Sequence, residues 1–209
     1  TVRQGSGLDE NKNLSLVAME RGWECLARFA ERLQGFQKFQ VRAVATQTLR
    51  EARNRDDFTR RAQEVLGFPI EVVSGHEEAR LIYQGVSHLL PQSDEKRLVI
   101  DIGGRSTEVI LGQGYSASKM ESYRLGSVAW SSRYFPRGQI TQQSLQTSEI
   151  AAKAVLDEAL DAYPVGSWDT AYGSSGTVGA VAEILTLNGW PAGQITRAGL
   201  DWLTDKLLR

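Results

Sequence analysis

The sequence predicts an α/β protein built from two half-repeats, each combining a small β-sheet with crossover helices. Apolar segments with β-strand composition alternate with segments of helical periodicity along the chain. A polar segment, His88–Lys96, interrupts this alternation, and three short strands then follow in succession. We therefore expect one domain over residues 1–92 and a second over residues 93–209.

The first half is expected to alternate strands and helices. Ser15 can cap a helix that Gly35 closes, and Ser74 can cap another with Glu77 as its capping-box partner. The expected order is a strand tail and turn over Thr1–Leu8, a helix from Ser15, a strand at Val41–Ala45, a helix from Asp56 to Gly67, a strand at Ile70–Val73 and a helix from Ser74 to about Val86.

The second half is expected to open with a three-stranded meander. Its first two strands are joined by a short glycine-containing turn, and helices follow the third strand. The expected elements are strands at 97–102, 107–111 and within about 115–125, helices at 128–134 and 141–162, a strand at 168–172, a helix to Asn188 and a last helix capped by Thr196. In the long helix we expect Ile150, Ala154, Val155, Leu156 and Ala159 to face inward.

The two halves have a similar order of elements, except that the first lacks an opening hairpin. Two such halves with a ligand cleft between them describe a two-domain actin-like ATPase (ribonuclease H-like) fold. The chain starts at Thr1 without a methionine and ends within an unfinished helical pattern at Arg209. We therefore expect a fragment that is incomplete at both ends.

Composition excludes several classes of function. The formal charge is −1 with acids and bases interspersed, which gives no electrostatic footprint for duplex nucleic acid. No apolar run has the length of a membrane span. The single cysteine, Cys25, fits a reducing cytoplasm, and two histidines with one cysteine make a zinc site improbable.

The turn between the first two strands of the second half is a candidate site for phosphate and metal. Gly103 and Gly104 allow positive φ, so that successive N–H groups can converge on an anion, and the hydroxyls of Ser106 and Thr107 add donors. Asp101 and Glu108 flank this turn, and their oxygens suit Mg²⁺. The alternative is a tight hairpin whose glycines serve only the turn.

A second candidate is the segment Gly173-Ser-Ser-Gly-Thr177, which follows a strand and opens a helix. Free N–H groups and the helix dipole attract anions there. The alternative is an ordinary strand-to-helix turn with a serine cap.

Glu78 and Arg50 are candidate catalytic side chains in the first half. Glu78 lies in the first helical turn after Ser74, where the helix dipole favours an ionised carboxylate that can activate water. Alternatively, Glu78 is only a favourable first-turn residue. Arg50 follows a strand and could clamp a phosphate through paired N–H groups, although an arginine there is more often a surface residue.

Four segments resemble motifs of one family. Val99-Ile-Asp-Ile-Gly-Gly-Arg-Ser-Thr-Glu108 resembles the Asp-Ile-Gly-Gly-Gly-Ser-Thr-Glu motif of the exopolyphosphatase / guanosine pentaphosphate phosphohydrolase (Ppx/GppA phosphatase) family. Ser74–Tyr83, Ala45–Ala52 and Gly173–Thr177 are similar to three further motifs of that family, in collinear order over nearly the whole chain.

The resemblance implies Mg²⁺-dependent hydrolysis of terminal phosphoanhydrides in inorganic polyphosphate or guanosine pentaphosphate. On the family pattern, Glu78 activates water, Arg50 reaches the cleft, and Asp101 and Glu108 serve the metal. The expected phosphate-binding residues are Gly103, Gly104, Arg105, Ser106, Thr107, Gly173, Ser174, Ser175, Gly176 and Thr177. The sequence allows a homodimer but does not specify the oligomeric state.

Two features depart from the family pattern. Arg105 replaces a glycine, so either the turn avoids positive φ at that position or strain is tolerated. The family's N-terminal Asp-Leu-Gly-Ser-Asn-Ser hairpin is absent, and we expect the fragment alone to have little activity. Two alternatives remain open: an actin-like sugar or acetate kinase, and a module that binds polyphosphate or guanosine phosphates without hydrolysing them.

Overall fold

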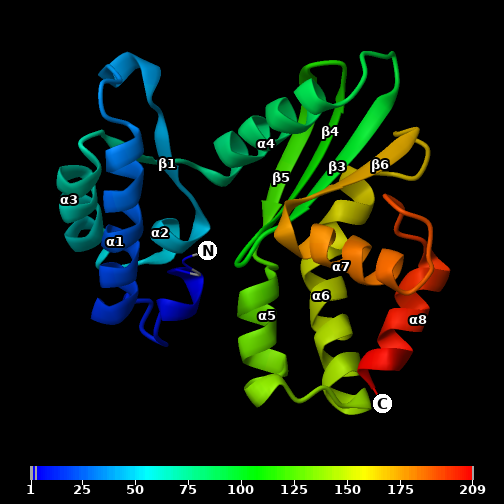
Figure 1. The fold of residues 1–209 in the computed structure, drawn as a ribbon. Coiled ribbons are helices and arrows are strands. Elements are labelled where there is room, and N and C mark those ends of the chain that lie inside the picture. Colours follow the sequence, from blue (N-terminus) through cyan, green and yellow to red (C-terminus); the bar gives the residue numbers. More distant parts are fainter. Residues whose placement is uncertain (1, 3, 209) are drawn as a thin grey trace. The chain divides into compact units, whose positions relative to one another are not determined.

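A computed structural model describes Val2 and residues 4–208 of the chain, which divide into two compact units, 1–78 and 79–209 (Figure 1). The division falls inside helix α4 (Gly75–Leu89), because Ala79 and Tyr83 of this helix are buried against Val99 and Ile110 of the second unit's sheet. The expected division after residue 92 stays a prediction about the domains of the complete protein.

The first unit packs helices against a pair of short parallel strands. Strands β1 (Ala43–Ala45) and β2 (Ile70–Val72) pair in register, and they are connected through helices α2 (Gln47–Glu51) and α3 (Arg55–Leu66). Helix α1 (Leu16–Arg32) begins at Ser15, whose Oγ accepts from the amide of Ala18 at 3.3 Å. The core consists of Leu14, Ala18, Met19, Trp23, Leu49, Ala52, Phe58 and Ala62.

Two expectations for the first unit need correction. Of the segment expected as a strand tail, residues 1 and 3 lie outside the described residues, and Gln4–Gly7 form a 3-10 helix (η1). Helix α3 starts at Arg55 with Asn54 as its N-terminal cap residue, not at Asp56. The Asn54 side chain bonds both the amide and the carbonyl of Leu14, which ties the start of α3 to the core.

The second unit contains the expected meander. Strands β3 (Lys96–Ile102), β4 (Thr107–Gln113), β5 (Ser116–Tyr123) and β6 (Thr170–Ser174) form one sheet in the order β5-β4-β3-β6. Strand β3 pairs antiparallel with β4 and parallel with β6. Both β3 and β6 therefore end at the same edge of the sheet.

Helices cover both faces of this sheet. Helix α4 packs on one face, and helix α6 (Gln142–Ala162) packs on the other through a cluster around Leu98, Val109 and Tyr163. Helices α7 (Ser175–Leu187) and α8 (Arg197–Leu207) follow β6, and the 3-10 segment η3 (Pro136–Gly138) precedes α6. None of the helices among the described residues has the length and apolar character that crossing a bilayer requires.

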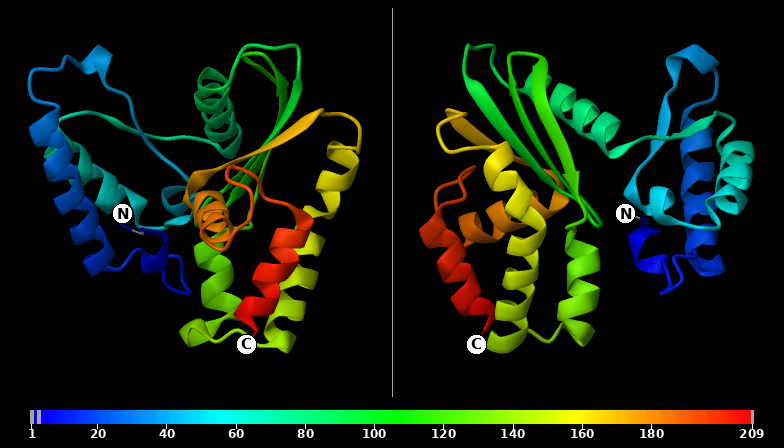
Figure 2. Two further views of the ribbon diagram at one scale, coloured as in Figure 1. Left: turned by 45° about the vertical axis from the view of Figure 1, so that its right-hand side comes forward. Right: turned by 180° about the vertical axis from the view of Figure 1, so that it is seen from behind.

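The inward face of α6 differs from the expectation at two positions. Val155, Leu156 and Ala159 pack on the sheet as expected, but Ile150 is 69% exposed and Ala154 is also exposed. The N-terminal half of α6 extends past the end of the sheet beside helix α5 (Ser127–Tyr134), as both views in Figure 2 show. That half, which carries Ile150, has no sheet to face, so the helical periodicity alone overestimated the buried stripe there; nothing in the structure explains the exposure of Ala154.

Candidate functional site

The turn between β3 and β4 closes a hairpin. Ile102 pairs with Thr107, and the amide of Gly103 donates to the carbonyl of Ser106 at 2.9 Å. Positive φ does not occur at Gly103, Gly104 or Arg105 among the described residues. The expected nest of glycines with positive φ is therefore wrong, and the turn accommodates Arg105 by avoiding that conformation.

Helix α5 docks closely on this turn. The carbonyl of Gly103 accepts from the amide of Ser127 at 2.9 Å, and that of Gly104 accepts from the amides of Val128 and Ala129. A Cβ at Gly126, just before α5, would lie 2.2 Å from the backbone nitrogen of Arg105. The turn carbonyls thus satisfy the first amides of α5, which leaves this helix end without open donors for an anion.

The first turn of α7 is the open helix end in this region. Its N-terminal cap residue, Ser174, makes no side-chain capping bond, so first-turn amides such as those of Gly176 and Thr177 have no partner within the helix. Ser175 has a φ of 79°, a left-handed conformation that a non-glycine residue adopts at a cost in strain.

Side-chain bonds join this helix end to the turn. Ser175 Oγ donates to the carbonyl of Ile102 at 2.7 Å, and Thr177 Oγ1 donates to Ser127 Oγ at 3.1 Å. Gly173 gives room for α7, because a Cβ there would lie 2.3 Å from Cγ1 of Val178. The two glycine-containing segments expected to bind phosphate therefore lie together at one end of the sheet.

The hydroxyls of Ser106 and Thr107, which were expected to help bind phosphate, are less available than the backbone amides of the turn. Thr107 Oγ1 donates to the carbonyl of Leu125, and both Ser106 and Thr107 are 4% exposed. The amides of Gly104 and Ser106 have no hydrogen-bond acceptor among the described residues. Backbone amides are thus the donors that this turn still offers.

Asp101 and Glu108 lie directly opposite each other in the β3–β4 ladder, so their side chains share one face. Burial raises the pKa of the half-buried Asp101, an effect that a hydrogen bond with Ser174 partly offsets. Glu108 is 1% exposed, and its Oε1 accepts from Ser122 Oγ at 2.7 Å. A cation bound at Asp101 would favour the ionised form of this desolvated carboxylate.

These acids fit Mg²⁺ in one respect. No group of three or more histidine, cysteine or acidic residues that could hold a metal occurs in the described part of the chain. Mg²⁺ sites often use only one or two carboxylates, with water and substrate phosphate completing the shell. Asp101 and Glu108 supply that minimum. Asp101 has fewer interactions with other side chains than Glu108 has.

Arg50 and Glu78 form an ion pair in the first unit. Arg50 Nη1 donates to Glu78 Oε2 at 2.7 Å, and the two side chains are 18% and 15% exposed. The guanidinium also donates to the carbonyl of Val73 and, through Nε and Nη2, to Gln47 Oε1. Arg50 is therefore held in place by these bonds. The alternative that it is an ordinary surface arginine does not apply.

The start of α4 agrees in part with the expected capping box. The amide of Glu77 donates to Ser74 Oγ at 3.1 Å. The carboxylate of Glu77 also accepts from Arg42 Nη2 at 3.1 Å. Its neighbour Glu78 has a different surrounding, because it faces Arg50.

Sequence reasoning missed two residues that organise these sites. Ser127 connects the turn to α7, and its position directly after Gly126 at a helix start was the available signal. Gln47 lies within the quoted segment Ala45–Ala52, but its contact with Arg50 joins residues on one short helix that was not expected.

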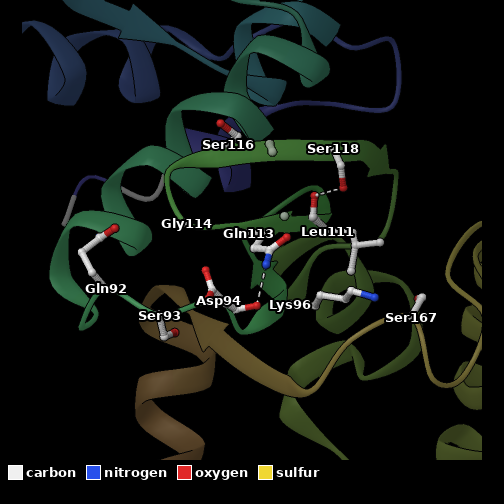
Figure 3. A pocket seen from close by; sticks show the side chains of 12 residues that line it. Gln92, Ser93, Asp94, Lys96, Leu111, Gln113, Gly114, Ser116, Ser118 and Ser167 are labelled. Atoms are coloured by element: carbon white, nitrogen blue, oxygen red, sulfur yellow. Dashed lines mark hydrogen bonds between the residues drawn. The ribbon is translucent and has the colours of Figure 1, made fainter.

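A pocket of about 1060 Å³ lies at the opposite end of the second unit's sheet (Figure 3). It is formed at the first residue of β3 and the β4–β5 hairpin, and none of the predicted site residues lines it. In Figure 3, Gln113 donates to the carbonyl of Asp94 and Ser118 to that of Leu111, so part of its polar lining is already paired. This pocket is thus separate from the candidate site.

The fold and the open α7 end define an α/β protein of the actin-like class. A model of the Ppx/GppA phosphatase family matches residues 1–209, and the chain belongs to that family. The expected family is therefore confirmed.

Individual proteins similar to this chain agree with the family assignment. Guanosine-5'-triphosphate,3'-diphosphate pyrophosphatase of Vibrio atlanticus is 47% identical over 188 residues, covering 90% of this chain and 38% of that protein. A solved exopolyphosphatase-like protein is 27% identical with a TM-score of 0.81, covering 89% of this chain and 59% of the other. The solved Ppx/GppA member of Aquifex aeolicus is 25% identical with a TM-score of 0.72, covering 98% and 67%. These structures confirm the expected fold class, and the chain spans well under half of the curated relative.

Proposed function

We propose that the complete protein hydrolyses a terminal phosphoanhydride bond, releasing orthophosphate. The observation that carries this proposal is the meeting of the β3–β4 turn, the open N-terminus of α7 and Asp101 at one end of one sheet. Guanosine pentaphosphate is the first candidate substrate because of the name of the Vibrio relative, and inorganic polyphosphate is the second.

Backbone amides would bind the phosphoryl oxygens. The amides of Gly104 and Ser106 and those of the first turn of α7 are the open donors, and the α7 dipole adds a favourable field. Phosphoryl transfer depends mainly on positioning and on neutralising charge at the equatorial oxygens. Donors held in place by a hairpin and a docked helix would need little rearrangement for this task.

Asp101, with Glu108 beside it, would hold Mg²⁺. The bound cation would neutralise phosphate charge and orient the terminal group. Without a cation, burial raises the pKa of Asp101. A bound cation would favour the ionised carboxylate and would lower that pKa.

We assign the activation of the attacking water to Glu78. Its Oε2 is held by Arg50, while its Oε1 has no hydrogen-bond partner among the described residues and is available to accept from a water molecule. Four N–H groups of Arg50 are used inside the first unit, which leaves one for a phosphate.

Phosphate release by the complete protein tests the proposal. Purified protein should release orthophosphate from guanosine pentaphosphate or polyphosphate with Mg²⁺ and stop when the cation is chelated. Formation of ADP from ATP with a sugar or acetate would instead support a kinase. Saturable ligand binding without phosphate release would support a binding module.

The cytoplasm is the proposed location. A single cysteine, Cys25, without a partner for a disulfide, suits a reducing compartment. Fractionation of cells that express the complete protein tests this.

A further inference from the structure

We propose that Gln47 is a positioning residue for Glu78 and acts on it through Arg50. The inference rests on the proposed role of Glu78 in water activation and assigns a function to a residue that no motif argument singled out. Its evidence lies entirely within the first unit, on helix α2, the end of β2 and the start of α4.

Gln47 fixes the orientation of the Arg50 side chain. Its Oε1 accepts from Arg50 Nε at 3.0 Å and from Arg50 Nη2 at 2.6 Å, so one amide oxygen holds one edge of the guanidinium. The other edge then carries Nη1, which donates to the carbonyl of Val73 at 2.9 Å and to Glu78 Oε2 at 2.7 Å. A planar guanidinium held on one edge has little freedom at the other.

The orientation of the Gln47 amide is itself fixed. Its Nε2 donates to Glu51 Oε1 at 2.6 Å, which directs Oε1 toward Arg50. Gln47 is 8% exposed, so this network lies largely out of water. Hydrogen bonds in such surroundings define geometry more strongly than exposed ones.

A neutral amide suits this position for an electrostatic reason. A carboxylate at residue 47 would compete with Glu78 for the charge of Arg50. The amide satisfies two N–H groups without doing so, and the charge of the guanidinium remains directed at Glu78. Glu78 is then held by Oε2 alone, which leaves Oε1 in a defined place for water.

The principal test removes the amide without changing the size of the side chain much. In the complete protein, Gln47→Met should lower kcat about tenfold while KM for guanosine pentaphosphate stays within about twofold, because small displacements of a catalytic group reduce turnover more than binding. Arg50→Lys, which keeps the charge but loses the planar fork, should lower kcat in the same way and guards against misfolding of the first variant.

Gln63→Met is the matched control. Gln63 Oε1 accepts from the amide of Ile70 at 2.9 Å in the same unit, so this variant loses a comparable bond that does not involve Arg50. It should lower the Tm less than Gln47→Met does, because one side-chain bond is lost where Gln47→Met loses three, and it should leave kcat unchanged. An equal loss of kcat in the control would overturn the proposal.

A double-mutant cycle separates this inference from the proposed function. In a Glu78→Gln background, Gln47→Met should change kcat less than about twofold, because the carboxylate that it positions is gone. The same tenfold loss in both backgrounds, or a Gln47→Met variant of normal kcat beside an inactive Glu78→Gln, would refute the positioning role alone. Full turnover by Glu78→Gln would refute both.

Discussion

In the first unit the candidate groups are charged side chains held by other side chains, whereas in the second they are backbone amides held by the docking of a helix. Arg50 and Glu78 depend on Gln47 and on the carbonyl of Val73. The β3–β4 turn depends on close contact with α5 at Gly126. Substitution of a single charged group in the first unit should therefore lower catalytic turnover. An added methyl group in the second unit should lower the stability of the fold.

The largest expected effect is on turnover. Glu78→Gln in the complete protein should reduce kcat at least about a hundredfold and leave substrate binding near normal, since the amide cannot accept a proton from water. Orthophosphate release and isothermal titration with guanosine pentaphosphate measure the two quantities. Undiminished phosphate release would contradict the assignment.

The corresponding change in the second unit is a steric one. Gly126→Ala places a Cβ 2.2–2.4 Å from the backbone N, Cα and C of Arg105. We expect a loss of about 2–3 kcal/mol in the free energy of unfolding.

Gly85→Ala is the control for this loss. Gly85 lies in α4 with nothing within 4 Å of its added Cβ, so alanine should leave stability equal or slightly higher. Denaturant unfolding compares the two variants. A Gly126→Ala protein as stable as the control would show that the turn does not need this close contact.

A third prediction concerns pH and the acid next to the turn. Because burial raises the pKa of Asp101 above its ordinary value of 3.8, the folded protein binds that proton more tightly than the unfolded chain. Its contribution to stability is complete below pH 3.8 and is lost as the pH rises through the folded pKa. In metal-free buffer, Asp101→Asn should therefore raise the Tm at pH 7 but much less at pH 4.

Asp157→Asn, at an exposed position of α6, should show no such dependence. Added Mg²⁺ should stabilise the wild type and not Asp101→Asn. A wild type that gains stability on going from pH 4 to pH 7, relative to Asp101→Asn, would have the wrong sign for this account.

The smallest expected effect separates strain from hydrogen bonding at Ser175. Both Ser175→Ala and Ser175→Gly lose the bond to the carbonyl of Ile102. Only glycine tolerates a φ of 79° without strain, so Ser175→Gly should be more stable than Ser175→Ala by about 1 kcal/mol. Equal stability of the two variants would mean that α7 can start in a relaxed conformation.

Much of the fold was predictable because its signals are local. The Ser15 and Thr196 caps, the β3–β4–β5 meander and the strand-to-helix junction before α7 follow from short-range chemistry. The exposure of Ile150 and the packing of Ala79 on the sheet depend on where a helix lies relative to the rest of the fold. Periodicity contains no information about that.

The proximity of the two glycine-containing segments was predictable from the sequence, but their backbone geometry was not. The motif placed Gly103, Gly104 and Gly173–Thr177 together correctly, since strand ends meet at one sheet edge. The expected reason for the glycines of the turn was wrong, because neither Gly103 nor Gly104 has positive φ. A Cβ at Gly104 would instead lie 3.3 Å from Val128 of α5, and one at Gly103 would lie 3.1 Å from the carbonyl of Ser106. Whether an amide points to a ligand or to a neighbouring helix is a tertiary property, and the roles of these residues in binding stay predictions.

The most direct test of phosphate binding by backbone amides is an amide-resolved NMR titration of the complete protein with guanosine pentaphosphate and Mg²⁺. The account predicts the largest chemical-shift changes at Gly104, Ser106, Gly176 and Thr177. Changes confined to the pocket around Lys96 and Gln113 at the other end of the sheet would contradict it.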